Sequence, residues 1–581
     1  MSGICVSTGS PDAPAIAARM TTRMARYGQT RTVLPLGSGT AAGRSFHGRL
    51  ESERAPVRGP DGVTVLVDGE IFDAHGPISD PAAAIAALYR GGRMNEAAYL
   101  NGSFAAIVVD EPRSTVTLAT DRLASRSLFV WRDGARLSVA SRLEALLEDA
   151  AVPRRLSAQG LMELLSYQRT LADHTQYAGV RSLPAARVLS FCGGQVREAQ
   201  TRRLAWRRPE CSHRETAVRL ESAIRNAVAR RTSDRVRHGL LLSGGIDARV
   251  MLGAARSAGR TLSCATAGTW DNLEVQIARA TARMASAPFR FLENPPANIA
   301  ASFDDATDVS DGLFPAPTNL FALMPGLARD HDVLLSGHGL DYTLRGYYMP
   351  CVMLRVAGSV SRLPRLRAIP DGAPATVERN MRVGIGLAGL ERALAPRVRA
   401  ELRERRVRAM EAALREVDVL SPYDSWDAFI LHNLGRHYAY SDFTAMEAVV
   451  AHRAPAFDDE IFDLYLSMPP KWRASGAAVH RAMNRIAPDL MGLPDANTDI
   501  SARLAFPVQL ALVFARACLR RLGLFRLPPP PDPAMSHGSW ARYGEVFRRD
   551  PALRGRLEGL MRSDALLDTG VFDRSGLCGV I

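Results

Sequence analysis

The sequence predicts a mixed-class protein, in which a β-rich α+β domain precedes an α/β domain with a parallel sheet and a helical lobe. Two observations lead to this prediction. Residues 1–200 hold short alternating runs of Val, Ile and Phe, whereas strands and helices alternate in regular order from residue 214 onward. The length of 581 residues also exceeds what one hydrophobic core serves, so about two to four domains are expected.

In the first part, Gly, Asp and Pro separate runs that are too short and too regularly alternating for helices. The clearest predicted strands are residues 63–67, 104–109, 115–119 and 128–131. We predict that residues 1–200 form one domain. The polar and basic stretch 201–213 is the predicted linker, and an apolar pattern of helical period follows over 214–231.

In the second part, apolar strands and amphipathic helices follow one another, which indicates a parallel sheet with both faces covered. The predicted strands are residues 239–242, 262–266, 289–292 and 332–335, and the predicted helices are 246–258 and 273–285. The strand at 332–335 closes the predicted series, and the pattern beyond residue 350 is almost wholly helical. We predict a second domain over 214–500 and a helical C-terminal extension over 501–581.

The composition indicates a soluble, cytoplasmic protein. Hydrophobic residues make up 47% and charged residues 23% of the chain, and the seven cysteines are scattered without CxxC spacing. We therefore expect neither zinc nor disulfides, and no secretory signal is visible. The most apolar stretch, 506–525, is interrupted by Arg516, Arg520 and Arg521, so no membrane span and no membrane partner are expected.

The formal charge of +13 comes almost entirely from arginine, because Lys471 is the single lysine. The positive charge is spread along the chain, and no RRM, KH or zinc-finger pattern accompanies it. We therefore do not expect a nucleic-acid partner.

The strongest chemical signal is the run Leu-Leu-Leu-Ser-Gly-Gly-Ile-Asp at residues 240–247. A buried strand ends in a Ser-Gly-Gly turn, and a helix begins at once. Backbone amides from Leu242 to Gly245, including those of Ser243 and Gly244, can then cradle a phosphate at the positive end of the helix dipole. Asp247 can hold the cation that neutralises a pyrophosphate. The alternative is a generic strand-to-helix turn.

This run resembles the pyrophosphate loop of N-type ATP pyrophosphatases, and residues 1–495 resemble the asparagine synthetase family. The first part is similar to a class II glutamine amidotransferase domain of the Ntn fold, at residues 1–4, 67–71, 100–105, 121–123 and 127–129. In the second part, the similar stretches are 268–271, 336–341 with 346–347, and 453–458.

The resemblance implies ATP and Mg²⁺ as cofactors of an amide-forming ligase that releases AMP and pyrophosphate. Gly268 would lie beside adenine, and Gly337 and Gly339 would belong to a second phosphate-side loop. Asp247 and Asp341 would share the Mg²⁺ ion. The substrate would be a small molecule or a peptide that carries a carboxylate.

Two departures from the family argue against the use of glutamine. The family's glutaminase needs a Cys directly after Met1, and this chain has Ser2, whose hydroxyl is a much weaker nucleophile. Asp68 replaces an Asn that stabilises the oxyanion, and a carboxylate opposes a developing negative charge. We therefore expect no glutamine hydrolysis.

The residues for amide formation depart further from the pattern. His338 stands where relatives carry a Tyr or Glu base, and it could act as a base or only hydrogen-bond its own loop. Ala451 replaces a family Glu, and Glu447, one helical turn earlier, could project onto the same face. Ala248 replaces a phosphate-side Ser, and no lysine stands at the family's catalytic position before Arg481.

Three functions stay open at this point. The chain resembles the lasso-peptide macrolactam synthetases and β-lactam synthetases, which also lack the Cys nucleophile and use an amine already present on the substrate. For a macrolactam synthetase, the partners would be a precursor peptide and a leader peptidase. The second alternative is an ammonia-using amidotransferase of a biosynthetic or polysaccharide cluster. The third is a nucleotide-binding scaffold without catalysis, which the altered positions 248 and 451 favour.

Overall fold

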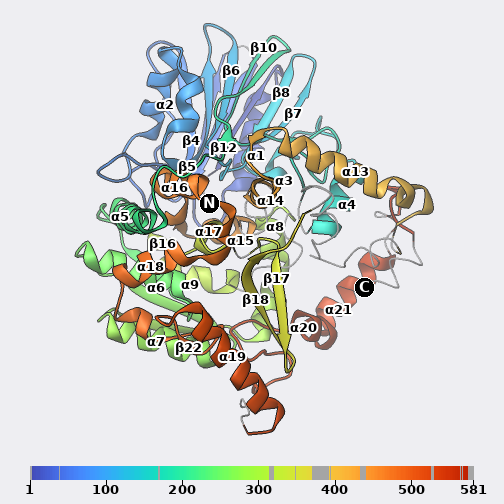
Figure 1. The fold of residues 1–581 in the computed structure, drawn as a ribbon. Coiled ribbons are helices and arrows are strands. Elements are labelled where there is room, and N and C mark those ends of the chain that lie inside the picture. Colours follow the sequence, from blue (N-terminus) through green and yellow to red (C-terminus); the bar gives the residue numbers. More distant parts are fainter. Residues whose placement is uncertain are drawn as a thin grey trace.

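The computed structural model contains two large bodies, a β-sandwich domain and below it in Figure 1 a domain built on a parallel sheet. The structure describes residues 3–37, 39–167, 170–312, 320–346, 348–369, 392, 394–431, 440–524, 529–562, 564 and 567–573.

The N-terminal domain consists of two antiparallel sheets packed face to face. Their strand orders are β2-β3-β1-β8-β7-β9 and β11-β10-β6-β5-β4. The strands are β1 (Gly3–Thr8), β2 (Thr30–Leu36), β3 (Thr40–Phe46), β4 (Val63–Ile71), β5 (Gly102–Asp110), β6 (Thr115–Thr120), β7 (Phe129–Asp133), β8 (Arg136–Ala140), β9 (Arg181–Ser182), β10 (Arg187–Cys192) and β11 (Gln195–Gln200). The predicted amidotransferase-like sandwich is confirmed.

Alternation along the strands decides which side chains meet between the sheets. Ile4 and Val6 of β1 face Ile107 and Val109 of β5 in the inner core. Helices cover the outer faces, so the domain has four layers. The six-stranded sheet carries α1 (Ala13–Met24) and α3 (Leu143–Leu146), and the five-stranded sheet carries α2 (Pro81–Arg90) and η1 (Met94–Tyr99).

The second domain has a five-stranded parallel sheet in the order β15-β14-β13-β16-β20. Its strands are β13 (His238–Leu241), β14 (Ser263–Gly268), β15 (Phe289–Glu293), β16 (Val333–Leu335) and β20 (Ala451–Arg453). The prediction that residues 332–335 close the series was wrong, because β20 pairs with β16 in parallel. This strand is as short as β16, but it follows more than one hundred residues later and so falls outside the alternation of strands and helices that predicted β16.

Helices cover both faces of this sheet. One face packs against α5 (His213–Arg231), α6 (Ile246–Ser257), α7 (Leu273–Met284) and α18 (Ala477–Ile486), and the other against α8 (Pro296–Val309), η2 (Phe321–Leu323), α9 (Met324–Asp330) and α15 (Tyr440–Glu447). The start of α5 is fixed by a capping box, in which Ser212 and Glu215 bond each other's backbone amides.

The segment after residue 350 is less helical than predicted. It begins with an antiparallel hairpin, β17 (Cys351–Val356) and β18 (Ser359–Leu366). Ala357 and Gly358 form its two-residue turn with φ values of 49° and 81°, which match the turn that the strand twist favours. The Ala-Gly pair is a weaker turn signal than Asn-Gly, and this hairpin was therefore missed.

The remaining elements complete the helical lobe. They are α4 (Ala158–Tyr167), α10 (Leu340–Thr343), α13 (Pro396–Leu414), α14 (Pro422–Phe429), η4 (Pro455–Phe457), α16 (Asp459–Ser467), α17 (Pro470–Ser475) and η5 (Leu490–Gly492), with the short strand pairs β12 (Leu204–Ala205) with β19 (Val417–Asp418) and β21 (Pro494–Asp495) with β22 (Ile500–Ser501). The pairing of β12 with β19 ties the 201–213 stretch to the lobe.

The C-terminal extension contains α19 (Phe506–Arg521), α20 (Tyr543–Arg549) and α21 (Pro551–Arg562). Before α20 the chain returns to the parallel-sheet domain, where the indole N–H of Trp270 donates to the Ser536 carbonyl at 2.9 Å. Of the helices that the structure describes, none has the length and apolar character needed to span a bilayer.

Candidate active site at the ends of the parallel strands

The Ser-Gly-Gly turn connects the end of β13 to the start of α6, as predicted. Leu242 is anchored through its N–H to the Ala265 carbonyl of β14 at 2.9 Å. A Cβ on Gly244 would lie 2.7 Å from the Cβ of Ala496 and 2.9 Å from the Glu274 carbonyl oxygen, so the turn has room only for glycine there. Gly245 is the N-cap residue of α6, and the turn therefore presents amides at a helix start.

Arg249, which is fully buried on α6, holds this turn in place. Its guanidinium donates to the Gly244 carbonyl at 2.7 Å and to the Leu493 carbonyl at 3.0 Å. It also bonds the carbonyl of Pro494. Because one cation binds carbonyls of both segments, the phosphate turn and the loop after η5 form a single unit.

A second loop, between β16 and α10, packs directly against the first. A Cβ on Gly337 would lie 2.6 Å from the carbonyl carbon of Asp247. Gly339 adopts φ +100°, and a Cβ on it would lie 2.8 Å from the Phe457 ring. The predicted glycines of this loop are therefore required by close approach and by left-handed backbone. The loop brings Asp341, in the first turn of α10, toward the phosphate turn.

Carboxylates gather where these loops meet. Asp247 forms an ion pair with Arg345 at 3.1 Å. Burial raises the pKa of Asp247 to about 6, Arg345 opposes the rise, and the neighbouring charges of Asp341 and Asp495 add to it. The third carboxylate, Asp495, was not anticipated, and no motif around it gives a signal. Its place follows from the Arg249 contacts to the loop that contains it.

This donor set suits Mg²⁺, which typically takes one or two carboxylates and completes its shell with phosphate oxygens and water. Asp247 and Asp341 are the residues that would hold it. Arg345 already lies against Asp247, so a bound ion would have to share that carboxylate. Within the described part of the chain, no group of three or more His, Cys, Asp or Glu side chains is arranged to hold a metal on its own.

An apolar pocket lies beside the turn, at the end of β14 where Gly268 stands. Its lining includes Leu242, Ser243, Ala265, Thr266, Ala267, Gly268, Leu292, Asn294, Leu323, Met324, Ser539 and Trp540. An apolar pocket at the carboxyl ends of parallel strands, with the Ser-Gly-Gly turn at its rim, fits an adenine nucleotide. Ser539 and Trp540 come from the C-terminal extension, which sequence reasoning had not connected with this pocket.

Ser243 lies at the boundary between this pocket and a groove of about 1110 Å³. The groove runs from the phosphate turn to α19 and to the tip of the β17–β18 hairpin. Its lining includes Gly245, Asp247, Trp270, Glu274, Gly358, Asn497, Asp499, Val513, Arg516, Arg520, Arg521 and Trp540. A substrate larger than an amino acid therefore has space next to the phosphate turn.

His338 is half-buried against aromatic rings. Its ring centroid lies 4.6 Å from that of Phe443 and 5.8 Å from that of Phe457. Burial lowers the pKa of His338 to about 3, so the imidazole is neutral at pH 7. Its backbone N–H donates to the Ser336 hydroxyl, which is itself bonded to His452 at 2.8 Å.

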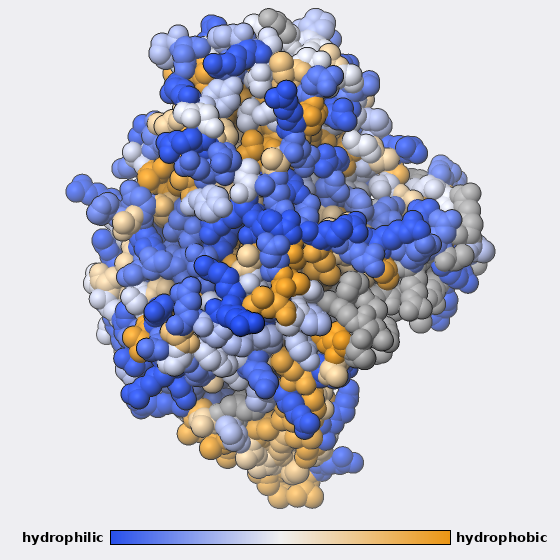
Figure 2. All heavy atoms as spheres, turned by 45° about the horizontal axis from the view of Figure 1, so that its top comes forward, coloured by the Kyte–Doolittle hydropathy of each residue, from blue (hydrophilic) through white to orange (hydrophobic). Residues whose placement is uncertain are grey.

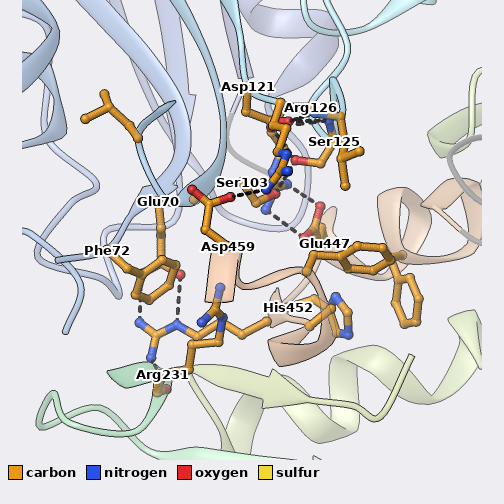
Figure 3. Close-up of a pocket in the computed structure, with 18 of the residues that line it drawn as sticks. Glu70, Phe72, Ser103, Asp121, Ser125, Arg126, Arg231, Glu447, His452 and Asp459 are labelled. Atoms are coloured by element: carbon orange, nitrogen blue, oxygen red, sulfur yellow. Dashed lines mark hydrogen bonds and ion pairs between the residues drawn. The ribbon is translucent and has the colours of Figure 1, made fainter. Parts of the chain in front are cut away.

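Glu447 is held from the other domain. Arg126, in the loop before β7, donates to Glu447 Oε1 at 2.7 Å and also bonds Oε2. Burial raises the pKa of Glu447 to about 7, which Arg126 opposes and the nearby Asp68 reinforces. Figure 3 shows the two side chains facing each other at one end of a pocket between the domains. Phe443 and Phe457, which His338 contacts, also line this pocket.

Other ion pairs join the domains around the same pocket. Arg453 of β20, which is almost fully buried, bonds both carboxylate oxygens of Glu70 at 2.7 and 2.8 Å and pairs with Asp234 at 2.7 Å. Arg122 pairs with Asp459 at 3.0 Å. Buried carboxylates and guanidinium groups of both domains therefore satisfy one another here.

The remaining positions singled out from the sequence are spread more widely. Ser2 and Tyr347 lie outside the described residues. Ala248 is buried in α6, and Ala451 opens β20. His480 of α18 bonds the Ala502 carbonyl at 2.6 Å, and Lys471 lies in the exposed first turn of α17.

The fold and this arrangement define a class of protein in which a parallel sheet with a Ser-Gly-Gly turn is joined to an amidotransferase-like sandwich. Comparison with known families agrees. The family described as asparagine synthase matches residues 219–511, and the glutamine amidotransferase domain family matches residues 78–202. The chain belongs to the asparagine synthase family.

Individual relatives are distant. Asparagine synthetase [glutamine-hydrolyzing] 3 of Bacillus subtilis is 25% identical over 158 residues, which is 27% of this chain and 26% of that protein. Two solved structures are each 12% identical over 50% of this chain. They are an allosteric regulatory enzyme of purine biosynthesis (80% covered, TM-score 0.26) and the glutamine phosphoribosylpyrophosphate amidotransferase of B. subtilis with ADP and GMP (65% covered, TM-score 0.25).

Proposed function

We propose that the protein uses ATP to adenylate a carboxylate and then joins it to an amine, without hydrolysing glutamine. The observation that carries the proposal is the contact between two loops at the ends of β13 and β16. Gly337 lies against Asp247, which brings Asp341 within electrostatic reach of the phosphate turn, and the Arg249 contacts to Leu493 and Pro494 bring Asp495 there too. Loops that only connected strands to helices would have no need for this packing.

In the first step, the amides of residues 243–245 would bind the pyrophosphate portion of ATP, and the apolar pocket would bind its base. A Mg²⁺ ion held by Asp247 and Asp341 would neutralise phosphate charge as the pyrophosphate departs. The substrate carboxylate oxygen attacks the α-phosphorus, the bond to the β-phosphate oxygen breaks, and pyrophosphate leaves. Arg345 can balance negative charge at the same place, because it already pairs with Asp247.

In the second step, the amine attacks the acyl carbon, AMP leaves and one proton must be removed. His338 is neutral near pH 7, but burial lowers its pKa to about 3, which makes the imidazole a weak base in this structure. The pKa of Glu447, about 7, is better matched to proton transfer, but Arg126 holds both of its carboxylate oxygens. The predicted pairing of His338 with Glu447 stays a prediction.

Two residues support independence from glutamine. Asp68 is buried in β4 and raises the pKa of Glu447, so negative charge already accumulates where an oxyanion would form. The sequence has Ser2 in place of the family's Cys. The amine would then come from the substrate itself or from solution.

The size of the groove favours an amine on a large substrate over free ammonia. The volume of the groove, about 1110 Å³, is at the upper end of the range for sites that bind drug-sized ligands. A volume of this size suits a peptide of several residues. A peptide that carries both the carboxylate and the amine would make the product a macrolactam. A precursor peptide and a leader peptidase are the proposed partners of such a reaction.

Exchange of labelled pyrophosphate into ATP, with candidate carboxylate substrates, tests the first step. Asp247→Asn should lose exchange, whereas Asp271→Asn, a change in an exposed carboxylate that pairs with Arg279, should keep it. Equal exchange by wild type and Asp247→Asn would overturn the assignment of the site. ATP binding without exchange for any carboxylate would favour the scaffold alternative.

A further inference from the structure

Two segments far apart in the sequence contain no acidic residue. Residues 342–370 and 500–531 each hold five arginines and neither Asp nor Glu, in a chain where about one residue in ten is acidic. Both segments are also rich in Leu and Val. The arginines of both segments therefore have no carboxylate within their own segment to neutralise them.

The helix of the second segment, α19, directs apolar side chains to solvent. Val508, Leu512 and Leu519 recur at helical spacing and are 46%, 42% and 43% exposed. Leu522 and Leu524 continue the row beyond the helix and are more than 70% exposed. A helix on the surface of a globular protein normally buries its apolar stripe, and α19 presents this one outward.

The hairpin of the first segment packs against α19. Its side chains Met353, Leu354 and Val360 are exposed. Arg355 and Arg365 are exposed beside them. Figure 1 shows the hairpin and α19 at the lower end of the molecule, and Figure 2 shows apolar surface gathered at that end. The exposed side chains of the β17–β18 hairpin and of α19 therefore form one surface, here called the basal surface.

We propose that the basal surface binds peripherally to a membrane that contains anionic phospholipid. Exposed leucines of an interfacial helix enter the boundary between headgroups and acyl chains, and arginines beside them are attracted to anionic headgroups. The absence of carboxylates from both segments removes the repulsion that such headgroups would cause. The arginines that interrupt residues 506–525 prevent a span, and they suit a helix lying in the interface. The expectation of no membrane partner is revised accordingly.

Binding in this orientation leaves the active-site groove open. Val513 and Ala517, which line the groove, lie on a different face of α19 from Leu512 and Leu519. A membrane would therefore lie beside the mouth of the groove, where a substrate held at the bilayer could enter.

Co-sedimentation of the purified full chain with vesicles tests the proposal. One preparation is phosphatidylcholine alone, and the other is an equal mixture of phosphatidylcholine and phosphatidylglycerol. We expect the partition coefficient to be at least about tenfold higher for the anionic vesicles. Binding should weaken at about 0.5 M NaCl, because salt screens the arginines.

The double variant Leu512→Glu/Leu519→Glu should lose at least about tenfold in partition onto anionic vesicles. Val57→Glu/Val218→Glu is the matched control, since it adds the same charge at two exposed valines outside the basal surface. Thermal melting must show that both variants fold. If the α19 variant does not fold, Arg355→Gln/Arg365→Gln tests the charge requirement on the hairpin.

Failure of the wild-type chain to bind anionic vesicles would overturn the proposal, as would full binding by the folded Leu512→Glu/Leu519→Glu variant. Equal binding to neutral and anionic vesicles would refute the role of anionic lipid. A wild-type dimer that this variant converts to a monomer, without vesicle binding, would assign the basal surface to a second copy of the chain and would also overturn the proposal.

Discussion

Arg126 and Glu447 form a buried ion pair that joins the amidotransferase-like domain to α15, a helix that covers the parallel sheet. Arg126 Nη2 lies 2.7 Å from Glu447 Oε1, and Nη1 contacts Oε2. Removal of one partner from such a pair leaves an uncompensated buried charge, which costs more than the pair itself contributes. The pair therefore makes the N-terminal domain part of the structural support of α15.

Glu447 should give the protein a recognisable dependence of stability on pH. Because the pKa of Glu447 is raised to about 7, the folded state holds the proton more tightly than the unfolded state does. This contribution to stability is present below the ordinary pKa and is lost as pH rises through about 7. In the wild type, this group should lower the free energy of unfolding by roughly 3 kcal/mol as the pH rises from about 4.5 to 7. The Glu447→Gln variant should lack this decrease.

Urea denaturation at several pH values measures this decline. Glu460→Gln, a change at an exposed residue that pairs with Arg230, is the control and should keep the wild-type slope. An unchanged slope in Glu447→Gln would show that another group is responsible. The slope is the readout because the variant also leaves Arg126 unpaired and is therefore less stable at every pH.

The two phosphate-side loops should tolerate no side chain at their contact. Gly337→Ala would place its Cβ 2.6 Å from the Asp247 carbonyl carbon, which belongs to rigid backbone. We expect pyrophosphate exchange to fall at least about tenfold, because the displaced loop no longer positions Asp341. Gly555→Ala, in α21 where no heavy atom lies within 4 Å of the added Cβ, should have wild-type exchange. Equal rates for the two variants would contradict the packing of these loops.

How much of this site was predictable depends on whether a residue acts within a local motif. The phosphate turn was predictable, because a strand, a tight turn and a helix start impose residue types at fixed spacing, and the glycines at 337 and 339 were implied by the family resemblance. Asp495 and Trp540 were not, because their positions depend on long-range contacts through Arg249 and Trp270. The partner of Glu447 was equally hidden, since Arg126 lies in the other domain and stands in no motif.

The same distinction applies to the fold. The strands β13, β14, β15 and β16 carry a regular alternation of strand and helix by which they are recognised. The three-residue strand β20 and the β17–β18 hairpin do not, because one owes its place to a distant partner and the other to a two-residue Ala-Gly turn. Local pattern therefore predicts elements better than it predicts the pairing of elements.

We expect no hydrolysis of glutamine. Incubation of the purified protein with glutamine should release glutamate no faster than the Ser2→Ala variant does, since neither a thiolate nor an unopposed oxyanion site is expected. Asp68→Asn alone should not change this result, because it supplies no nucleophile. Turnover by the wild type well above both variants would contradict independence from glutamine.

The last prediction separates the two half-reactions at His338. Adenylation needs no base, so His338→Ala should keep pyrophosphate exchange, whereas amide formation should slow by roughly 10²- to 10⁴-fold if the imidazole accepts the proton from the amine. Burial holds the pKa of His338 near 3, so the wild-type rate of amide formation should show no imidazole titration between about pH 5 and 8. Phe457→Leu is the control for packing, because it removes one aromatic neighbour of His338 and leaves the imidazole. Equal loss of both half-reactions in His338→Ala would show that the residue has a structural role. It would then act through its contacts with Phe443 and Phe457, which hold the loop between β16 and α10 in place.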